Sequence, residues 1–217
     1  MNSRAATRVA VLVSGSGTNL QAIIDELAAG KLPLEIIAVI SDRPDAYGLE
    51  RARAAGIDAL AIDYQAFATR ADYDAELEAT LQKLAPDLVV LAGYMRILAD
   101  STVTGLHGRM LNVHPSLLPA YPGLHTYARA LAAGETWHGT TVHFVIPELD
   151  AGPPVLQYRV RIKANETEPE LRERVQQGEY LIYPQVIGWF AEHRLALTNN
   201  QVILDGKVLS EPLVHDE

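Results

Sequence analysis

The chain has 217 residues, 48% hydrophobic and 21% charged, which is typical of a folded globular protein and disfavours disorder. Its formal net charge of −9 comes without a cluster of basic residues, which disfavours nucleic acid as a partner. The absence of cysteine excludes disulfides and thiolate chemistry and fits a reducing compartment. The apolar run in "MNSRAATRVAVLVSG" is too short for a signal-peptide core or a membrane span. We therefore expect a cytoplasmic protein with no membrane partner.

The first half of the chain alternates short apolar runs with segments of helical period. We expect strands at residues 9–13, 36–40, 59–62, 88–91 and 110–113, and helices at residues 20–27, 49–55 and 73–84. Gly30 and Gly56 follow the first two helices as stops, and Thr69 with Asp72 resembles a capping box before the third. Apolar strands alternating with helices predict a doubly wound, mostly parallel α/β sheet with helices on both faces, that is, a Rossmann-like fold.

The second half has a different pattern. The segment "GTTVHFVIPELDAGPPVLQYRVRI" predicts two strands around a loop rich in Pro and Gly, so the later strands are expected to be partly antiparallel. Residues 168–194 predict one long helix, bent near Pro184. Short strands with Asn-Asn and Asp-Gly turns follow. We predict a single domain over residues 1–217, with a flexible lead at 1–7 and a C-terminal hairpin and tail at 195–217.

A loop with two glycines, "SGSGTN", joins the first strand to the first helix. Backbone N–H groups at a helix start, approached closely past glycine, suit an anion such as phosphate. The loop is not the dinucleotide fingerprint, because Leu20 stands where the third glycine belongs, and no Lys-Ser/Thr pair makes it a P-loop. Asp42 after the second strand could imitate the ribose-binding acid of a nicotinamide enzyme. A plain strand-to-helix turn explains the loop equally well.

The stretch "LNVHPSLLP" places two polar side chains where a strand ends. Asn112 and His114 share a face of that strand, and Val113 between them points into the core. Asp150, in the "ELDAGPP" loop, is a candidate partner that would raise the pKa of His114. An amide and an imidazolium on one face can both donate hydrogen bonds to an oxygen that gains negative charge. This trio suits attack by an amine on an acyl carbon.

Other chemistries fit the residues less well. A serine nucleophile would need a G-x-S-x-G elbow, and the "SGSG" loop lacks its first glycine. A metal site from His114, His125, His143 and Asp150 lacks the short ligand spacings. His143 lies within a predicted strand, opposite in phase to Val142 and Phe144, so it could face a cleft or solvent. His125 could be a loop histidine of no consequence, and the remaining histidines apart from His114 lie in surface-like segments or short polar connections. The residues alone therefore indicate acyl or amide chemistry without a covalent enzyme intermediate.

Five segments carry a family resemblance: "SGSGTNLQAI", "AGYMRIL", "LNVHPSLLPAYPGLHT", "HGTTVHFV" and "LDAGP". In order and spacing they resemble the phosphoribosylglycinamide formyltransferases, a 10-formyltetrahydrofolate-dependent formyltransferase family. The likeness runs from about Arg8 to beyond Tyr183. It implies transfer of a formyl group from 10-formyltetrahydrofolate, as co-substrate, to the amine of glycinamide ribonucleotide in purine biosynthesis, with no metal.

The resemblance also implies roles for particular residues. The catalytic residues would be Asn112, His114 and Asp150. The ribonucleotide would be bound by Gly17, Thr18, Asn19 and Glu179. The folate would be bound by Arg70, Met95, Arg96, Ile97, Leu98 and Asn112.

Rival functions remain within the family and outside it. Methionyl-tRNA formyltransferase carries an added domain for tRNA, and formyltetrahydrofolate deformylase usually carries an extra N-terminal domain, neither of which this sequence displays. A nicotinamide-dependent oxidoreductase and a non-catalytic nucleotide-binding module are the alternatives from other classes. The sequence leaves open whether the protein is a monomer or a homodimer, how far the 147–153 loop moves, and whether the Leu118–Pro119 bond is cis, as a sharp turn beside the site would suit.

Overall fold

The computed structural model describes residues 6–217, and the chain divides after Leu111 into two compact units. Residues 1–5 of the expected flexible lead lie outside the described residues, and Thr7 already belongs to the first strand. A single domain over residues 1–217 stays a prediction. None of the helices within residues 6–217 is long and apolar enough to cross a membrane.

The first unit contains four parallel strands and the helices that connect them. Its elements are β1 (Thr7–Val13), α1 (Thr18–Ala28), β2 (Leu34–Ser41), α2 (Tyr47–Ala54), β3 (Ala59–Ala61), the short 3₁₀ turn η1 (Tyr64–Ala66), α3 (Arg70–Leu84), β4 (Leu88–Leu91) and α4 (Asp100–Gly105). The strands lie in the order β4-β1-β2-β3, and every pair among them is parallel.

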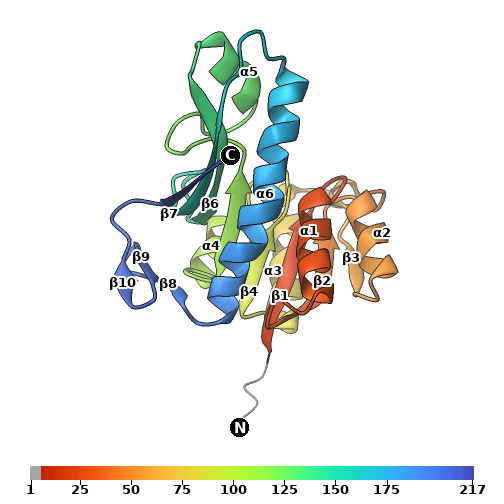
Figure 1. The fold of residues 1–217 in the computed structure, drawn as a ribbon. Helices are drawn as coiled ribbons and strands as arrows, with labels where there is room; N and C mark the ends of the chain where they lie inside the picture. The colour runs from red at the N-terminus through yellow and green to blue at the C-terminus, as the bar shows by residue number, and fades with distance from the viewer. Residues whose placement is uncertain (1–5) are drawn as a thin grey trace. The chain divides into compact units, whose positions relative to one another are not determined.

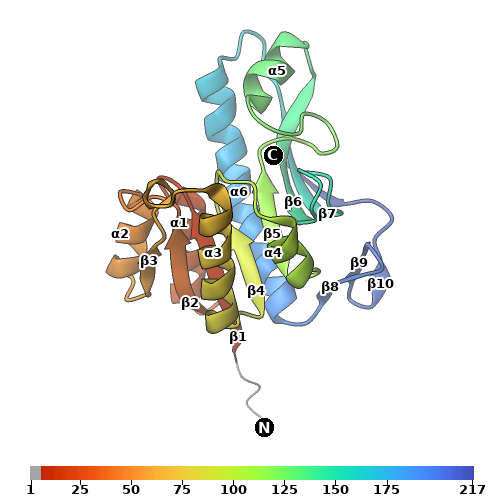
Figure 2. The ribbon, with the colours of Figure 1, turned by 180° about the vertical axis from the view of Figure 1, so that it is seen from behind.

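The buried strands explain this arrangement. All four residues of β4 and six of the seven in β1 are buried, so both faces of these strands must be covered. Helix α1 covers one face with Leu20, Ile23 and Ile24 (Figure 1), and α3 covers the opposite face (Figure 2). The predicted doubly wound, mostly parallel fold is confirmed.

Local signals in the sequence place the expected elements of this unit to within about three residues of their observed boundaries. The Thr69 hydroxyl accepts a hydrogen bond from the Asp72 N–H at 3.2 Å and donates one to the Asp72 carboxylate at 2.7 Å, so Thr69 is the N-cap of α3. Helix α1 ends shortly before Gly30, whose φ of 72° is the left-handed conformation expected after a helix. Helix α4 was not predicted, because it is only six residues long and has no helical period.

The second unit combines antiparallel and parallel strands with one long helix. The chain enters it within β5 (Met110–His114) and continues through α5 (Thr126–Ala132), β6 (Trp137–Phe144), β7 (Pro154–Arg161), α6 (Glu168–Ala191), β8 (Leu195–Thr198), β9 (Gln201–Leu204), β10 (Lys207–Val208) and β11 (Leu213–Asp216). The strand order is β11-β7-β6-β5, with β6 and β7 antiparallel as predicted.

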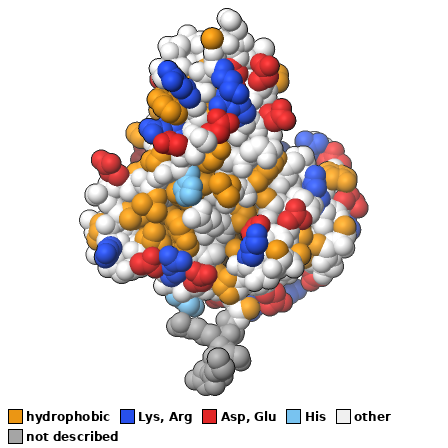
Figure 3. All heavy atoms as spheres, viewed as in Figure 1, with side chains coloured by type: hydrophobic (Ala, Val, Ile, Leu, Met, Phe, Trp, Pro, Cys, Tyr) orange, Lys and Arg blue, Asp and Glu red, His pale blue; other side chains and the backbone are white. Residues whose placement is uncertain are grey.

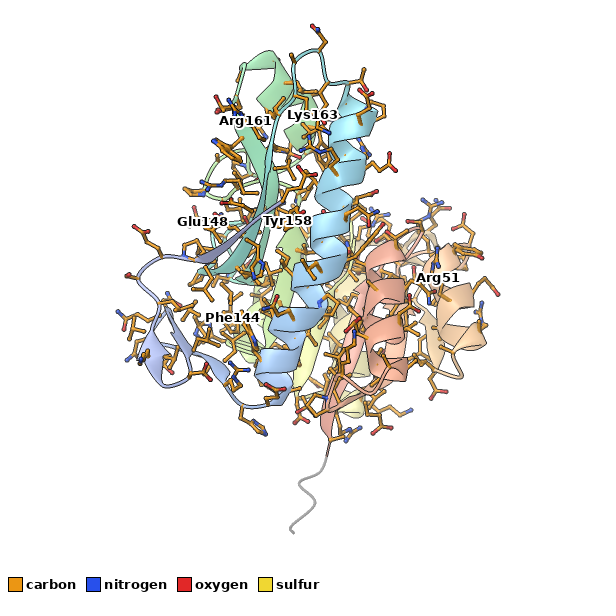
Figure 4. All side chains as sticks on the ribbon, viewed as in Figure 1. Arg51, Phe144, Glu148, Tyr158, Arg161 and Lys163 are labelled. Carbon is orange, nitrogen blue, oxygen red and sulfur yellow. The ribbon has the colours of Figure 1, made fainter. Side chains whose placement is uncertain are left out.

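Helix α6 packs along β6 and β7 (Figure 1) and begins at the predicted residue, where Thr167 and Glu170 form a capping box. Gly178 permits the close approach, because a Cβ there would lie 2.0 Å from the ring of Tyr158, labelled in Figure 4. Pro184 lies inside the helix as expected, and a bend at that point stays a prediction.

The C-terminal segment contains the expected turns and one strand that was not predicted. Asn199 and Asn200 connect β8 to β9, and Asp205 and Gly206 connect β9 to β10, all four with positive φ. These three strands form a small antiparallel sheet of their own. The expected tail instead contains β11, which pairs in parallel with β7.

Ion pairs hold β11 and the start of α6 in place. Arg159 pairs with Asp216 at 2.8 Å, and Arg174 pairs with both Glu166, at 2.6 Å, and Glu217. Acidic and basic side chains alternate over the end of this unit that carries α5 and the start of α6 (Figure 3). The partners in these ion pairs are separated by 43 positions for Arg174 and Glu217 and by 57 positions for Arg159 and Asp216. No local pattern in the sequence therefore predicts the pairing of the tail.

Candidate active site

The two polar residues of β5 lie where strand alternation predicts. Val113 is buried between them, His114 is 6% exposed and Asn112 is half-buried. The Thr140 hydroxyl of β6 donates a hydrogen bond to the His114 carbonyl at 2.9 Å and fixes the end of the strand. Asn112 and His114 are thus presented by a rigid strand rather than by a loop.

The imidazole of His114 is held at both nitrogens. Its Nε2 lies 3.0 Å from the Tyr121 carbonyl oxygen, and because a carbonyl only accepts, Nε2 carries a proton. Its Nδ1 faces the Asp150 carboxylate with 3.4 Å between Nδ1 and Oδ2. That separation exceeds the ~2.8 Å of a charge-assisted hydrogen bond, so the pair is close but not tightly bonded.

Asp150 is oriented by its own loop and by a second one. Its side chain is 8% exposed, its backbone has a left-handed φ of 52°, and its Oδ2 accepts a hydrogen bond from the Gly123 N–H at 2.8 Å. The "YPG" and "LDAG" loops are therefore tied together by this carboxylate. The structure brings Asn112, His114 and Asp150 into one cluster, and the Leu118–Pro119 bond nearby is cis.

A fourth side chain, His143 of β6, belongs to this cluster. It is 2% exposed, its Nε2 lies 3.1 Å from Asn112 Nδ2, and the same nitrogen lies 4.0 Å from Asp150 Oδ1. Burial lowers the pKa of His143 to about 4, so the ring is neutral at pH 7. The sequence left His143 between a cleft-facing and a solvent-facing position. Its alternation with Val142 and Phe144 was the available signal.

The other histidines are placed differently from one another. His125 is the residue before α5, with a φ of 58°. His138, expected in a short polar connection, is instead buried in β6 with its ring centroid 5.3 Å from that of Tyr127. Among residues 6–217, no three His, Asp or Glu side chains are grouped as a metal ion would need, so the metal-site alternative gains no support.

In the first unit the glycine loop has the features of an anion site. Gly17 has a φ of 67°, and a Cβ there would lie 2.6 Å from the Gly48 Cα, so only glycine fits. Helix α1 begins at Thr18 without a side-chain cap, and Asn19 is buried in its first turn. Arg51, shown on α2 in Figure 4, donates to the Ser16 carbonyl at 2.8 Å and adds positive charge that sequence reasoning missed.

Apart from Asn112, the residues expected to bind folate also lie in this unit. The Arg70 guanidinium donates to the Ile97 carbonyl at 2.9 Å, which brings α3 against the 95–98 loop. The Met95 and Ile97 side chains are 67% and 57% exposed, whereas Leu98 is buried. Two large apolar side chains exposed on one short loop are available to an apolar ligand surface.

Arg96 has a different environment from its neighbours. Its Nε lies 2.8 Å from Asp42 Oδ2, and its guanidinium lies 3.7 Å from the centroid of the Tyr64 ring. The Asp42 side chain is 1% exposed. The Asp42 carboxylate is therefore buried and ion-paired with Arg96, which argues against its use as the ribose-binding acid of a nicotinamide enzyme.

Glu179, the remaining residue expected to bind the ribonucleotide, is buried on α6. Its negative charge adds to the effect of burial in raising the pKa of Tyr127 on α5. A buried carboxylate on a rigid helix is suited to hydrogen bonding with ligand hydroxyl groups.

Comparison with known proteins identifies the family. The sequence profile of the family described as formyl transferase matches residues 7–187. The phosphoribosylglycinamide formyltransferase of Escherichia coli K12 is 51% identical over 201 residues, which cover 93% of this chain and 95% of that protein. The chain belongs to the formyl transferase family. The resemblance inferred from the sequence is confirmed.

Solved structures of the formyl transferase family agree with this assignment. The phosphoribosylglycinamide formyltransferase of Coxiella burnetii has a TM-score of 0.91 and 49% identity, covering 96% of this chain and 99% of that one. A formyltetrahydrofolate deformylase from Burkholderia mallei has a TM-score of 0.83 and 26% identity, but this chain covers only 70% of it. The fold is thus shared across the family, and sequence identity is higher with these two ribonucleotide enzymes, at 51% and 49%, than with the deformylase, at 26%.

Proposed function

We propose that the protein transfers the formyl group of 10-formyltetrahydrofolate to the amine of glycinamide ribonucleotide, a step of purine biosynthesis. The observation that carries the proposal is the cluster of Asn112, His114 and Asp150. It occurs in a chain that aligns with phosphoribosylglycinamide formyltransferases over more than nine tenths of each protein. An amide, an imidazole and a carboxylate without an activated Ser or Cys suit direct attack by the amine.

The reaction needs stabilisation of one charge and movement of one proton. The amine lone pair forms a bond to the formyl carbon, and the carbonyl electron pair moves onto oxygen. When the tetrahedral intermediate collapses, the bond to the folate nitrogen breaks, and that nitrogen gains a proton while the attacking nitrogen loses one. Asn112 and the His114 imidazolium donate hydrogen bonds to the oxyanion, where preorganised donors are most effective.

The contacts of His114 support different tasks for its two nitrogens. The Nε2–H is engaged by the Tyr121 carbonyl, and Nδ1 lies on the side of Asp150. In this proposal Nδ1 donates the proton that the folate nitrogen takes up, and Asp150 orients the ring.

The ribonucleotide-binding roles belong to the same proposal. Gly17, Thr18 and Asn19 bind the phosphate through backbone N–H groups at the start of α1, helped by the charge of Arg51. Glu179 accepts hydrogen bonds from the ribose hydroxyls. These assignments are supported by the left-handed Gly17, the uncapped helix start and the buried carboxylate.

The folate-binding roles fall on the 95–98 loop, Arg70 and Asn112. Met95 and Ile97 cover the apolar faces of the pterin, and Leu98 supports the loop from beneath. Arg70 fixes the loop through the Ile97 carbonyl. Because the Arg96 side chain is paired with Asp42, Arg96 contributes through its backbone.

The remaining expectations complete the proposal. They are a cytoplasmic location, action as a monomer or homodimer, no metal, and no nucleic-acid or membrane partner. All are consistent with a small-molecule transferase of this family, and none is needed for the chemistry described.

The acceptor assay tests the proposal. Purified protein is mixed with 10-formyltetrahydrofolate, with and without glycinamide ribonucleotide, and both tetrahydrofolate and formylated ribonucleotide are measured. We expect rapid loss of the folate substrate only when the acceptor is present, with one formylated product per folate consumed. Equal loss without acceptor, with release of formate, would instead establish a deformylase.

A further inference from the structure

One buried side chain near the end of strand β6 contacts the active-site amide. The pairing of β6 with β7 shifts register beside it, because Val142 pairs with Leu156 and His143 with Pro154, which leaves Val155 of β7 as the extra residue of a β-bulge. Bulges are common beside functional sites. The β6 residue at this point is His143, whose Nε2 lies 3.1 Å from Asn112 Nδ2.

The second nitrogen of His143 fixes the tautomer of its ring. Nδ1 lies 2.9 Å from the Phe144 carbonyl oxygen, which can only accept a hydrogen bond, so Nδ1 carries the proton. In the neutral ring Nε2 then carries no proton and can accept a hydrogen bond through its lone pair. A neutral ring is consistent with the lowering of the His143 pKa by burial. A lone pair at Nε2 requires an N–H, rather than an oxygen, from the facing Asn112 amide.

We infer that His143 is a positioning residue that sets the orientation of the Asn112 amide. By accepting one N–H of Asn112 Nδ2, it prevents the amide from turning over and leaves the second N–H free for the substrate oxyanion. The inference rests on the proposed function for the identity of that oxyanion, but the hydrogen-bond arrangement does not.

Gly152 allows the neighbouring loop to pack closely against the hydrogen bond between His143 and Phe144. A Cβ on Gly152 would lie 1.7 Å from the Phe144 carbonyl oxygen and 3.4 Å from His143 Nδ1. The loop that carries Asp150 therefore packs directly against the hydrogen bond that selects the tautomer. The Phe144 N–H in turn donates to the Pro153 carbonyl at 3.1 Å, which holds the loop and the strand together. Figure 4 labels Phe144 at the end of this strand.

Two substitutions separate positioning from packing. In His143→Gln the side-chain amide reaches the place of Nε2, and its oxygen can accept from Asn112. In His143→Asn the shorter amide reaches only the place of Nδ1, so it can bond Phe144 but leaves Asn112 without a partner. We expect His143→Asn to lower kcat on the order of ten- to a hundredfold, His143→Gln to recover most of that loss, and KM for both substrates to change little.

Controls keep this comparison decisive. His215→Asn, at an exposed position of β11, should behave as wild type. In an Asn112→Ala background, His143→Asn should cause no further loss of kcat, because the amide that it orients is gone. Equal kcat losses for the Gln and Asn variants, or a full additional loss in the Asn112→Ala background, would overturn the inference.

The tautomer can be measured without any reaction. Long-range ¹H–¹⁵N correlation spectra of the wild-type protein at pH 7 should show His143 protonated at Nδ1 and unprotonated at Nε2. A ring protonated at Nε2, or at both nitrogens, would overturn the inference even if transfer activity is found. Conversely, a protein that shows the expected tautomer but forms no formylated ribonucleotide would contradict the proposed function alone.

Discussion

The two units present their functional residues in opposite ways. In the first unit the groups proposed to bind ligands are backbone N–H groups at a glycine loop and side chains such as Met95, which is 67% exposed. In the second unit the polar side chains are themselves buried, with His114 6% and His143 2% exposed. Recognition can use accessible backbone and apolar surface, whereas stabilising a charge requires polar groups already removed from water and fixed in place.

The largest effect should come from removing the buried donors. We expect His114→Ala and Asn112→Ala each to lower kcat on the order of a hundredfold or more, because each removes a donor to the oxyanion. Steady-state kinetics with thermal unfolding as a check on folding measures this, and His215→Ala at an exposed position is the matched control. Near-normal turnover by either folded variant would contradict the role proposed for the second unit in stabilising the oxyanion.

Acid should weaken the second unit more than the first, because both buried histidines with lowered pKa values lie there. Burial lowers the pKa values of His138 and His143 from 6.5 to about 4. As the pH falls below 6.5 the unfolded chain takes up these protons and the folded chain does not, so the stability present in full above pH 6.5 is lost between 6.5 and 4. Between pH 7 and 5 we expect a loss on the order of 2 kcal/mol for each ring.

Urea unfolding across this pH range measures the effect, and amide hydrogen exchange locates it. Protection in β6 and β7 should fall more than protection in β1 and β4 after correction for intrinsic exchange. His143→Gln should have a pH dependence smaller by about one proton, since Gln does not titrate. Equal losses in both units, or an unchanged slope in His143→Gln, would show that these histidines do not account for the acid sensitivity.

A substitution in the glycine loop should weaken ribonucleotide binding, and a second glycine with a similar φ separates this effect from backbone strain. Gly17→Ala places a Cβ 2.6 Å from the Gly48 Cα and should raise KM for glycinamide ribonucleotide about tenfold by displacing the phosphate-binding N–H groups. Gly30→Ala shares the positive φ, 72° against 67°, but its Cβ meets nothing within 4 Å. Gly30→Ala should lose on the order of 1 kcal/mol of stability from its positive φ alone, and Gly17→Ala should lose more because of the added backbone clash. A similar KM in the two variants would argue against phosphate binding at Gly17.

The smallest effect should come from the exposed apolar residues. Met95→Ala and Ile97→Ala should each raise KM for the folate about three- to tenfold, with little change in kcat or stability, because each loses apolar area buried only by the ligand. Val208→Ala, which truncates a side chain of comparable exposure on β10, should change neither constant. Unchanged folate KM in both variants would remove the 95–98 loop from folate binding.

Much of the fold was predictable because its signals are local. The strands at 9–13, 36–40 and 88–91 are confirmed, as are the starts of α3 and α6. The short helices α4 and α5 and the edge strand β11 were missed, because short helices have too few turns to show a period and an edge strand is defined by its partner. The same limit explains His138, whose polar neighbours suggested a connection although the residue is buried in a strand.

By itself, the sequence determined the order and type of the longer elements, the shared face of Asn112 and His114, and the family. Alternation and helical period depend only on near neighbours along the chain, and motif order depends on no contact at all. Tertiary structure alone decided that Arg96 forms an ion pair with Asp42, 54 positions away, and that His143 contacts Asn112, 31 positions away. It also decided which nitrogen of His114 faces Asp150. Those outcomes depend on strand pairing and on loops that bring distant side chains within a few ångströms, and hydrogen bonds act only at such distances.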